Sequence, residues 1–212
     1  MGSTTKMNLS RHPVNVVFDL DNTLIYSIPY AKFPRKRTSH LHSKPHHVMD
    51  DEYVIFERPG LQAFLDYVFD HFNVSVWSAA SPEYVEFIVE HVICTKPNRH
   101  VEYVLHSDNC EDCQDYYGEQ HFKNLHYLWD VHDLPGYGPL NTLIVDDLGW
   151  VKKTQPHSCI QIKAFNTNHK QCWEDCEFAK TIQPKLDDLL KRFSKEVESP
   201  TFQLVPLDRV NS

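Results

Sequence analysis

The sequence has no long hydrophobic run, no excess of positive charge and no internal repeat. Neither residues 1–12 nor any later run reaches the ~18 apolar residues that suggest a membrane span, so we expect no signal peptide and no membrane segment. The formal net charge of -8 argues against a direct nucleic-acid partner or an anionic membrane held by a global electrostatic field. An anionic ligand must therefore be bound by a local arrangement of charges.

The six cysteines show no disulfide framework. Because no secretory signal is recognisable, we expect reduced thiols and a cytoplasmic or nuclear protein. A structural zinc site is the alternative, since Cys110 and Cys113 form a Cys-x-x-Cys and Cys172 and Cys176 lie four residues apart. The full Cys-x-x-Cys…Cys-x-x-Cys spacing is missing, which favours free thiols.

The composition is that of a globular protein. With 212 residues, 41% of them hydrophobic and 24% charged, the chain fits one domain with a substantial core. We expect a flexible N-terminus over residues 1–12, one domain over residues 13–193 and a loosely ordered tail over residues 194–212, because that tail is polar and aperiodic.

Strand and helix patterns alternate along the chain. Apolar and β-branched runs predict strands at Val14–Phe18, Val54–Phe56, Phe72–Trp77, Val101–Leu105, Leu143–Val145 and Cys159–Ile162. Apolar stripes predict helices at Leu61–Phe69, Pro82–Val92 and Leu186–Phe193. The predicted fold class is α/β, with a doubly wound, mostly parallel sheet, a short flap and a small hairpin insertion around Cys110 and Cys113.

Two of the predicted strands end in paired acids. Asp19 and Asp21 follow the first strand, and Asp146 and Asp147 follow Leu143–Val145. Because the carboxyl ends of parallel strands meet at one edge of a sheet, we expect the four carboxyl groups to lie close together. Their mutual repulsion indicates a hard metal ion bound through oxygen, although either pair alone is also compatible with a solvated turn.

Two further polar residues are expected at the same edge. Ser78 follows the strand that ends at Trp77, and Lys123 opens a predicted helix after a polar insertion. A metal, a carboxylate nucleophile, a hydroxyl donor and a cation together suit phosphoryl transfer. Taken singly, a serine and a lysine have no such meaning.

The ordered set of motifs resembles the haloacid dehalogenase superfamily. Within it, the sequence is similar to the RNA polymerase II C-terminal-domain phosphatases, also called NLI-interacting-factor-like phosphatases. The segments that carry this resemblance are Asp19–Leu24, Arg58–Leu61, Trp77–Ala80, Lys123–Leu125 and Val145–Asp147. The segments Trp77–Ala80 and Pro82–Val85 also resemble the copies of this family in large DNA viruses.

The resemblance implies a role for each acid. Asp19 would be the nucleophile that forms an aspartyl-phosphate, and Asp21 would protonate the leaving oxygen and then activate water. Magnesium would be bound by the side chains of Asp19 and Asp147 and by the backbone carbonyl of Asp21.

The same resemblance implies the substrate contacts. Thr23 and Ser78 would donate hydrogen bonds to the phosphoryl oxygens, while Lys123 would neutralise the phosphate and the nucleophile. Asp146 would orient Lys123 through an ion pair. The substrate would be a phosphoserine or phosphothreonine protein or peptide, such as the tail of RNA polymerase II.

The segment after the first motif is basic and aromatic. Residues 31–37 and the histidines that follow are expected to overhang the site as a flap, in which Tyr26, Tyr30 and Phe33 contact a proline of the substrate. A solvated loop explains the same residues equally well. Two other functions also remain open, namely a small-molecule phosphomonoesterase of the same fold and a non-catalytic phosphopeptide-binding module.

Overall fold

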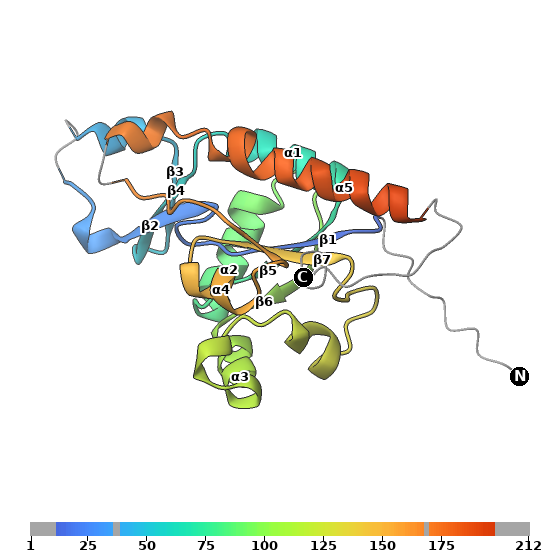
Figure 1. Ribbon diagram of the computed structural model, residues 1–212. Coiled ribbons are helices and arrows are strands. Elements are labelled where there is room, and N and C mark those ends of the chain that lie inside the picture. The colour runs from blue at the N-terminus through green and yellow to red at the C-terminus, as the bar shows by residue number, and fades with distance from the viewer. Residues whose placement is uncertain (1–11, 36–38, 168–169, 198–212) are drawn as a thin grey trace, which may run out of the picture.

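The computed structural model describes residues 12–35, 39–167 and 170–197 (Figure 1). Its centre is a five-stranded parallel sheet with the order β6-β5-β1-β7-β8. The strands are β1 (Asn15–Phe18), β5 (Asn73–Trp77), β6 (Val101–Leu105), β7 (Thr142–Asp146) and β8 (Cys159–Gln161). The predicted parallel sheet is confirmed, with β8 as an edge strand.

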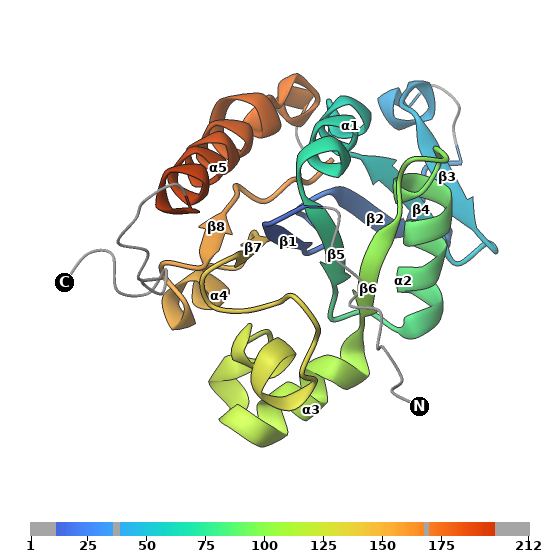
Figure 2. The same cartoon turned by 90° about the vertical axis from the view of Figure 1, so that its right-hand side faces the viewer.

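Helices cover both faces of this sheet. The α-helices are α1 (Leu61–His71), α2 (Pro82–Ile88), α3 (Ser107–Tyr117), α4 (Gly149–Thr154) and α5 (Gln183–Val197). Helices α1 and α5 lie side by side on one face, and α3 lies on the other (Figures 1 and 2). Short 3-10 or π-helical turns span Tyr30–Lys32, His40–Ser43, Val89–Ile93, Glu119–His121, Tyr127–Val131, Lys170–Glu174 and Phe178–Ile182.

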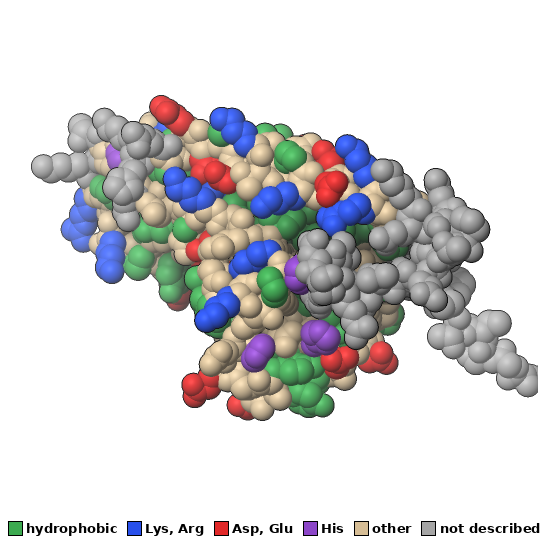
Figure 3. All heavy atoms as spheres, in the orientation of Figure 1, with side chains coloured by type: hydrophobic (Ala, Val, Ile, Leu, Met, Phe, Trp, Pro, Cys, Tyr) green, Lys and Arg blue, Asp and Glu red, His purple; other side chains and the backbone are tan. Residues whose placement is uncertain are grey.

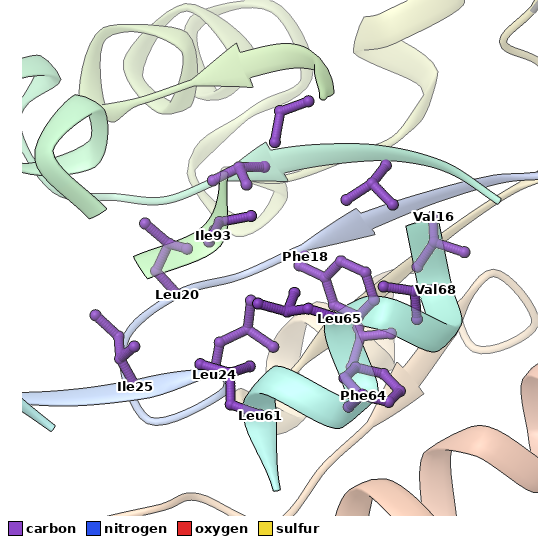
Figure 4. Close-up of a cluster of buried hydrophobic side chains, with 14 of the residues drawn as sticks. Val16, Phe18, Leu20, Leu24, Ile25, Leu61, Phe64, Leu65, Val68 and Ile93 are labelled. Atoms are coloured by element: carbon purple, nitrogen blue, oxygen red, sulfur yellow. The ribbon is translucent and has the colours of Figure 1, made fainter. Parts of the chain in front are cut away.

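The central strand β1 is buried on both faces. Val16 and Phe18 pack in the cluster that contains α1, where the Phe18 and Phe64 rings meet edge to face with centroids 5.7 Å apart (Figure 4). Val17 packs on the opposite face, in the cluster that contains Leu128. A strand buried on both faces has a continuous apolar run, which explains the pattern in the sequence.

The flap is a second, antiparallel sheet with the order β2-β4-β3. Its strands are β2 (Ile25–Pro29), β3 (His46–Met49) and β4 (Tyr53–Glu57), and the sheet lies beyond the carboxyl end of β1 (Figure 1). The predicted strand at Val54–Phe56 is therefore the middle of the flap, whereas we expected it outside the flap. A short apolar run shows that a strand is buried but does not show which sheet it joins.

The predicted hairpin insertion is wrong, because Cys110 and Cys113 lie on α3. The helix buries these two thiols, which are three residues apart on one face. Its N-terminus is capped by Asn109, whose Oδ1 accepts a hydrogen bond from the backbone of His106 at 2.9 Å. The remaining residues of α3 are mostly polar, so its apolar stripe is too narrow to stand out in the sequence.

Two other expectations differ from the structure in detail. Lys123 lies in a turn after a 3-10 segment and does not open a helix. Helix α5 continues to Val197, past the boundary that we expected after residue 193. Residues 1–11, 36–38 and 198–212 lie outside the described residues, and with them the basic end of the flap and most of the predicted termini.

Candidate active site

Strand β1 positions the first acid. Asp19 follows Phe18 directly, and its backbone N–H donates a hydrogen bond of 3.0 Å to the Val145 carbonyl of β7. Asn22 adopts a left-handed conformation with φ 61°, which asparagine tolerates better than most residues, and its N–H bonds to the Ile25 carbonyl at 2.8 Å. The turn leads the chain into β2, which lies beyond the carboxyl end of β1, so Asp19 and Asp21 are both at this edge of the sheet (Figure 1).

Asp19 belongs to a buried ion-pair network. The Lys123 ammonium lies 2.6 Å from Asp19 Oδ1 and 3.0 Å from Asp146 Oδ2, and all three side chains are almost fully buried. Burial raises the pKa of Asp19 to about 7, against the opposing effect of Lys123. Burial alone would lower the pKa of Lys123, but the neighbouring carboxylates of Asp19 and Asp146 outweigh this effect and raise the pKa above its usual value. The structure thus brings together the three residues expected here.

The carboxylates suit a divalent metal ion. Asp19, Asp146 and Asp147 each offer an oxygen, and the three oxygens lie within 4.8 Å of one another. Burial and the neighbouring Asp146 raise the pKa of Asp147. Since three carboxylates share the single ammonium of Lys123, a hard cation with oxygen ligands would balance the remaining charge. Among the described residues no other group of three metal-binding side chains is found.

The raised pKa of Asp19 predicts a pH-dependent stability in the absence of metal. Above pH 3.8 the unfolded chain loses this proton while the folded protein keeps it up to about pH 7, so Asp19 makes folding less favourable as pH rises between these values. The Asp19→Asn variant lacks this contribution. In EDTA, its Tm should exceed that of the wild type at pH 8, and the difference should shrink towards pH 4. A difference that does not vary with pH would contradict the assigned pKa.

Asp21 is held by two hydroxyl groups that the sequence did not reveal. Its Oδ1 accepts hydrogen bonds from Tyr84 Oη at 2.7 Å and from Ser27 Oγ at 3.1 Å. Burial raises the pKa of Asp21, which favours the protonated form that an acid catalyst needs. Tyr84 is placed by the start of α2, where Ser81 Oγ accepts from its backbone N–H at 3.4 Å.

Two hydroxyl groups lie at the same edge. Thr23 Oγ1 is fully buried and makes no hydrogen bond of normal geometry, yet it lowers the pKa of both Asp19 and Asp147. A buried hydroxyl without a partner is costly, and an anionic ligand would relieve that cost. Ser78 is 2% exposed and follows β5, with its Oγ accepting from the Ala80 N–H at 3.1 Å.

The backbone around Lys123 is fixed by Gln155, which sequence reasoning missed. Gln155 Nε2 donates to the Lys123 carbonyl at 2.7 Å, and Gln155 Oε1 accepts from the Leu125 N–H at 3.1 Å. Asp146 is fixed as well, because its Oδ1 accepts from the Leu148 N–H at 2.8 Å. No local motif in the sequence pointed to Gln155, Ser27 or the hydroxyl of Tyr84.

Comparison with known families identifies the chain. The sequence model of the NLI interacting factor-like phosphatases matches residues 14–198, which is most of the protein. The chain belongs to the NLI interacting factor-like phosphatase family. The resemblance seen in the motifs is thereby confirmed, and the family supports a phosphatase of the haloacid dehalogenase kind.

Relatives of this family member come from viruses and eukaryotes. It is 40% identical over 158 residues to a putative CTD phosphatase-like protein of Invertebrate iridescent virus 6, which covers 71% of this chain and 85% of that protein. A counterpart in Invertebrate iridescent virus 3 is 34% identical over 181 residues, which are 81% of this chain and 94% of that protein. A ubiquitin-like domain-containing CTD phosphatase of Arabidopsis thaliana is 29% identical over a region that covers 64% of this chain and 44% of that protein.

The chain is also similar to two solved structures. One is the fission yeast RNA polymerase II CTD phosphatase Fcp1 with beryllium fluoride, and the other is Fcp1, an essential RNA polymerase II CTD phosphatase. Their sequence identities are 15% and 16%, their TM-scores are 0.49 and 0.47, and each comparison covers 93% of this chain and 58% of the other.

No helix among the described residues of this family member is long and apolar enough to cross a membrane.

Proposed function

We propose that this family member is a magnesium-dependent protein serine/threonine phosphatase with Asp19 as its nucleophile. The observation that carries the proposal is the buried network of Asp19, Lys123 and Asp146 at the carboxyl edge of the sheet, with Asp147 beside it. Solvated turns do not need a buried lysine shared between two carboxylates. A phosphoryl-transfer site does need it, because charge develops there in the transition state.

The proposed first step is attack on phosphorus by a carboxylate oxygen of Asp19. The bond between phosphorus and the seryl or threonyl oxygen breaks, and Asp21 gives its proton to that leaving oxygen. Lys123 balances the charge of Asp19 and of the phosphoryl group. The pKa of Asp21, which burial raises, supports the assignment as acid. The hydroxyl groups of Tyr84 and Ser27 hold the carboxyl group in place and lower this pKa, so they favour the ionised form that Asp21 reaches after it has given up its proton.

The second step releases phosphate from the aspartyl-phosphate. Asp21, now ionised, takes a proton from water, and the oxygen of that water attacks phosphorus. The bond between phosphorus and the Asp19 oxygen breaks, which releases phosphate and restores the Asp19 carboxylate. Thr23 and Ser78 are proposed to donate hydrogen bonds to the phosphoryl oxygens in both steps. Magnesium, held by Asp19, Asp147 and the Asp21 carbonyl, would favour the ionised form of Asp19 and neutralise phosphate charge.

A phosphoprotein is the proposed substrate. The flap is a small three-stranded sheet, and the carboxyl edge is not covered by a large cap domain within the described residues. The relatives are named as CTD phosphatases or as similar to them, which makes phosphorylated peptides from the RNA polymerase II tail the first substrates to test.

Hydrolysis of para-nitrophenyl phosphate tests the proposal. The wild type should hydrolyse this ester in the presence of magnesium, and EDTA should abolish the activity because the carboxylate charges are then unbalanced. Addition of excess magnesium to the same sample should restore the activity and would exclude irreversible unfolding. A folded wild type that gives no turnover with magnesium would instead favour a non-catalytic phosphopeptide-binding module.

Loss of the Ser78 hydroxyl should slow turnover without unfolding the protein. Removal of one preorganised donor to the phosphoryl group costs about 10²-fold in kcat, so we expect Ser78→Ala to lose activity on that order. Ser75→Ala is the matched control, because it removes a hydroxyl from the same strand where Ser75 Oγ lies 2.6 Å from the Tyr137 hydroxyl. Equal kcat for the two variants would remove Ser78 from the proposed site.

A further inference from the structure

A groove with a cavity of about 640 Å³ opens beside Asp21, between the flap sheet and α2. We define the acidic groove by six of its lining residues, which are Asp21, Asp50, Glu52, Tyr53, Glu83 and Tyr84. Asp21 belongs both to this groove and to the proposed catalytic site. A chain bound in the groove would therefore continue directly into the reacting centre.

The charge of the groove is negative and unbalanced. No described residue that lines it is a lysine or arginine, and no ion pair within the described part of the chain involves Asp50, Glu52 or Glu83. The N–H of Glu83 itself and the Ser81 hydroxyl hold the pKa of Glu83 below its usual value, so it is ionised at neutral pH.

Positive side chains gather at a different place. Lys152, Lys185 and Arg192 line a separate cavity of about 380 Å³ near β8 and α5. Figure 3 shows lysine and arginine side chains spread over the face that carries α5. The negative charge beside Asp21 is therefore a local property of the groove and does not simply reflect the net charge of -8.

The groove also has aromatic walls. The Tyr53 and Tyr84 rings meet edge to face with centroids 5.3 Å apart, and Tyr84 is anchored by its hydrogen bond to Asp21. Aromatic rings beside carboxylates attract lysine and arginine side chains, whose methylene groups pack on the rings while the charged end meets an acid.

Two of the acids, Asp50 and Glu52, stand on a well-defined turn between β3 and β4. Asp50 and Asp51 both have left-handed backbone conformations, with φ 39° and 58°. The turn is closed by the Glu52 N–H, which bonds to the Met49 carbonyl at 2.7 Å, and the Glu52 carbonyl accepts from the Tyr30 N–H at 2.7 Å. A fixed backbone reduces the entropy that Asp50 and Glu52 would lose when a ligand binds.

We propose that the acidic groove binds a lysine or arginine side chain of the phosphoprotein substrate, near in sequence to the phosphorylated residue. This inference rests on the proposed function, because Asp21 is the acid of that reaction. In the proposed site Lys123 and magnesium balance the phosphoryl group, whereas Asp50, Glu52 and Glu83 line the groove without an ion-pair partner among the described residues. A basic residue near the phosphorylated residue would balance these acids and set the direction in which the peptide lies.

Binding of phosphonate peptides tests the inference independently of turnover. Each fluorescent peptide would carry the non-hydrolysable phosphonate analogue of phosphoserine. One of the three positions on either side of this analogue would be varied, and it would hold Arg, Ala or Glu. In magnesium, fluorescence anisotropy should show that the best Arg peptide binds roughly tenfold more tightly than its Ala counterpart, since one cation would meet more than one exposed acid. In the double variant Asp50→Asn, Glu83→Gln this ratio should fall to about twofold or less.

Two neighbouring acids provide matched controls. Asp51→Asn changes the adjacent residue of the same turn, and Glu86→Gln changes an acid on the same helix as Glu83, but neither residue lines the groove. Both variants should keep the wild-type ratio. Equal binding of the Arg, Ala and Glu peptides to the wild type, or an unchanged ratio in the double variant, would overturn the inference. A wild type that fails to hydrolyse para-nitrophenyl phosphate would count against the proposed function alone, because the binding ratio does not depend on turnover.

Discussion

Asp19→Asn is expected to lower kcat/KM for para-nitrophenyl phosphate by about 10⁴-fold or more, as the loss of a catalytic nucleophile does in other enzymes. The asparagine amide cannot attack phosphorus, whereas its size and shape match those of aspartate. Lys123 keeps its ion pair with Asp146 at 3.0 Å, so the turn that carries the lysine retains one of its anchors. The variant should therefore remain folded, with a circular dichroism spectrum like that of the wild type.

The matched control for this variant is Asp188→Asn on α5. Asp188 forms a surface ion pair with Arg192 at 3.1 Å, and the same chemical change there should leave kcat/KM within twofold, because exposed pairs contribute about 1 kcal/mol or less and this one is remote from the site. Retention of more than a tenth of the wild-type activity by Asp19→Asn would contradict the assigned nucleophile. Mass spectrometry of the wild type, quenched during turnover, should in turn find phosphate on the peptide that contains Asp19.

The acids of the site were predictable because they follow strands. Parallel strands bring their carboxyl ends to one edge, so Asp19 after β1 and Asp147 after β7 had to lie close together once the order of the sheet placed these strands side by side. Lys123 was harder, since its turn follows no strand. Its place was expected only from the order of the family motifs, and the ion pairs with Asp19 and Asp146 now give that place a physical basis.

The supporting residues were not predictable from local patterns. Tyr84 fits the apolar stripe of α2, and the residue is indeed only 5% exposed, but the stripe says nothing about the hydroxyl that reaches Asp21. Gln155 acts across the fold in the same way, because it bonds the backbone of Lys123. Ser27 lies near Asp21 in the sequence, but its contact depends on the turn between β1 and β2. Periodicity reports which side of an element is buried, whereas a contact between distant segments depends on tertiary packing. The same limit explains why β4 was not assigned to the flap and why the narrow apolar face of α3 was missed.

Arg58, at the end of β4, shows how such a contact organises the site. It is 1% exposed, and its guanidinium donates to the Thr23 carbonyl at 3.0 Å and to the Lys163 carbonyl at 2.7 Å. It also forms an ion pair with Asp175 at 2.9 Å and lies over the Phe178 ring at 5.5 Å. One side chain thus joins the loop that carries Thr23 to two segments near the C-terminal helix.

Arg58→Met should therefore destabilise the protein strongly. Methionine fills similar space, but it leaves Asp175, whose side chain is 11% exposed, without its partner, and it leaves two carbonyl groups without a donor. Removal of one member of a buried pair costs about 3–5 kcal/mol, which corresponds to a fall in Tm of roughly 10 °C for a chain of this size. Thermal unfolding followed by circular dichroism would measure the change.

A surface arginine and a double variant separate the causes. Arg192→Met removes an arginine that is half exposed, and it should cost about 1 kcal/mol or less. Addition of Asp175→Asn to Arg58→Met should recover part of the lost stability, because the amide is cheaper to bury than an unpaired carboxylate. If Arg58→Met lowers the Tm no more than Arg192→Met does, the guanidinium does not hold these segments together. In that case Thr23 is held by the turn at Asn22 and by its own N–H, which bonds to the Leu20 carbonyl at 3.1 Å.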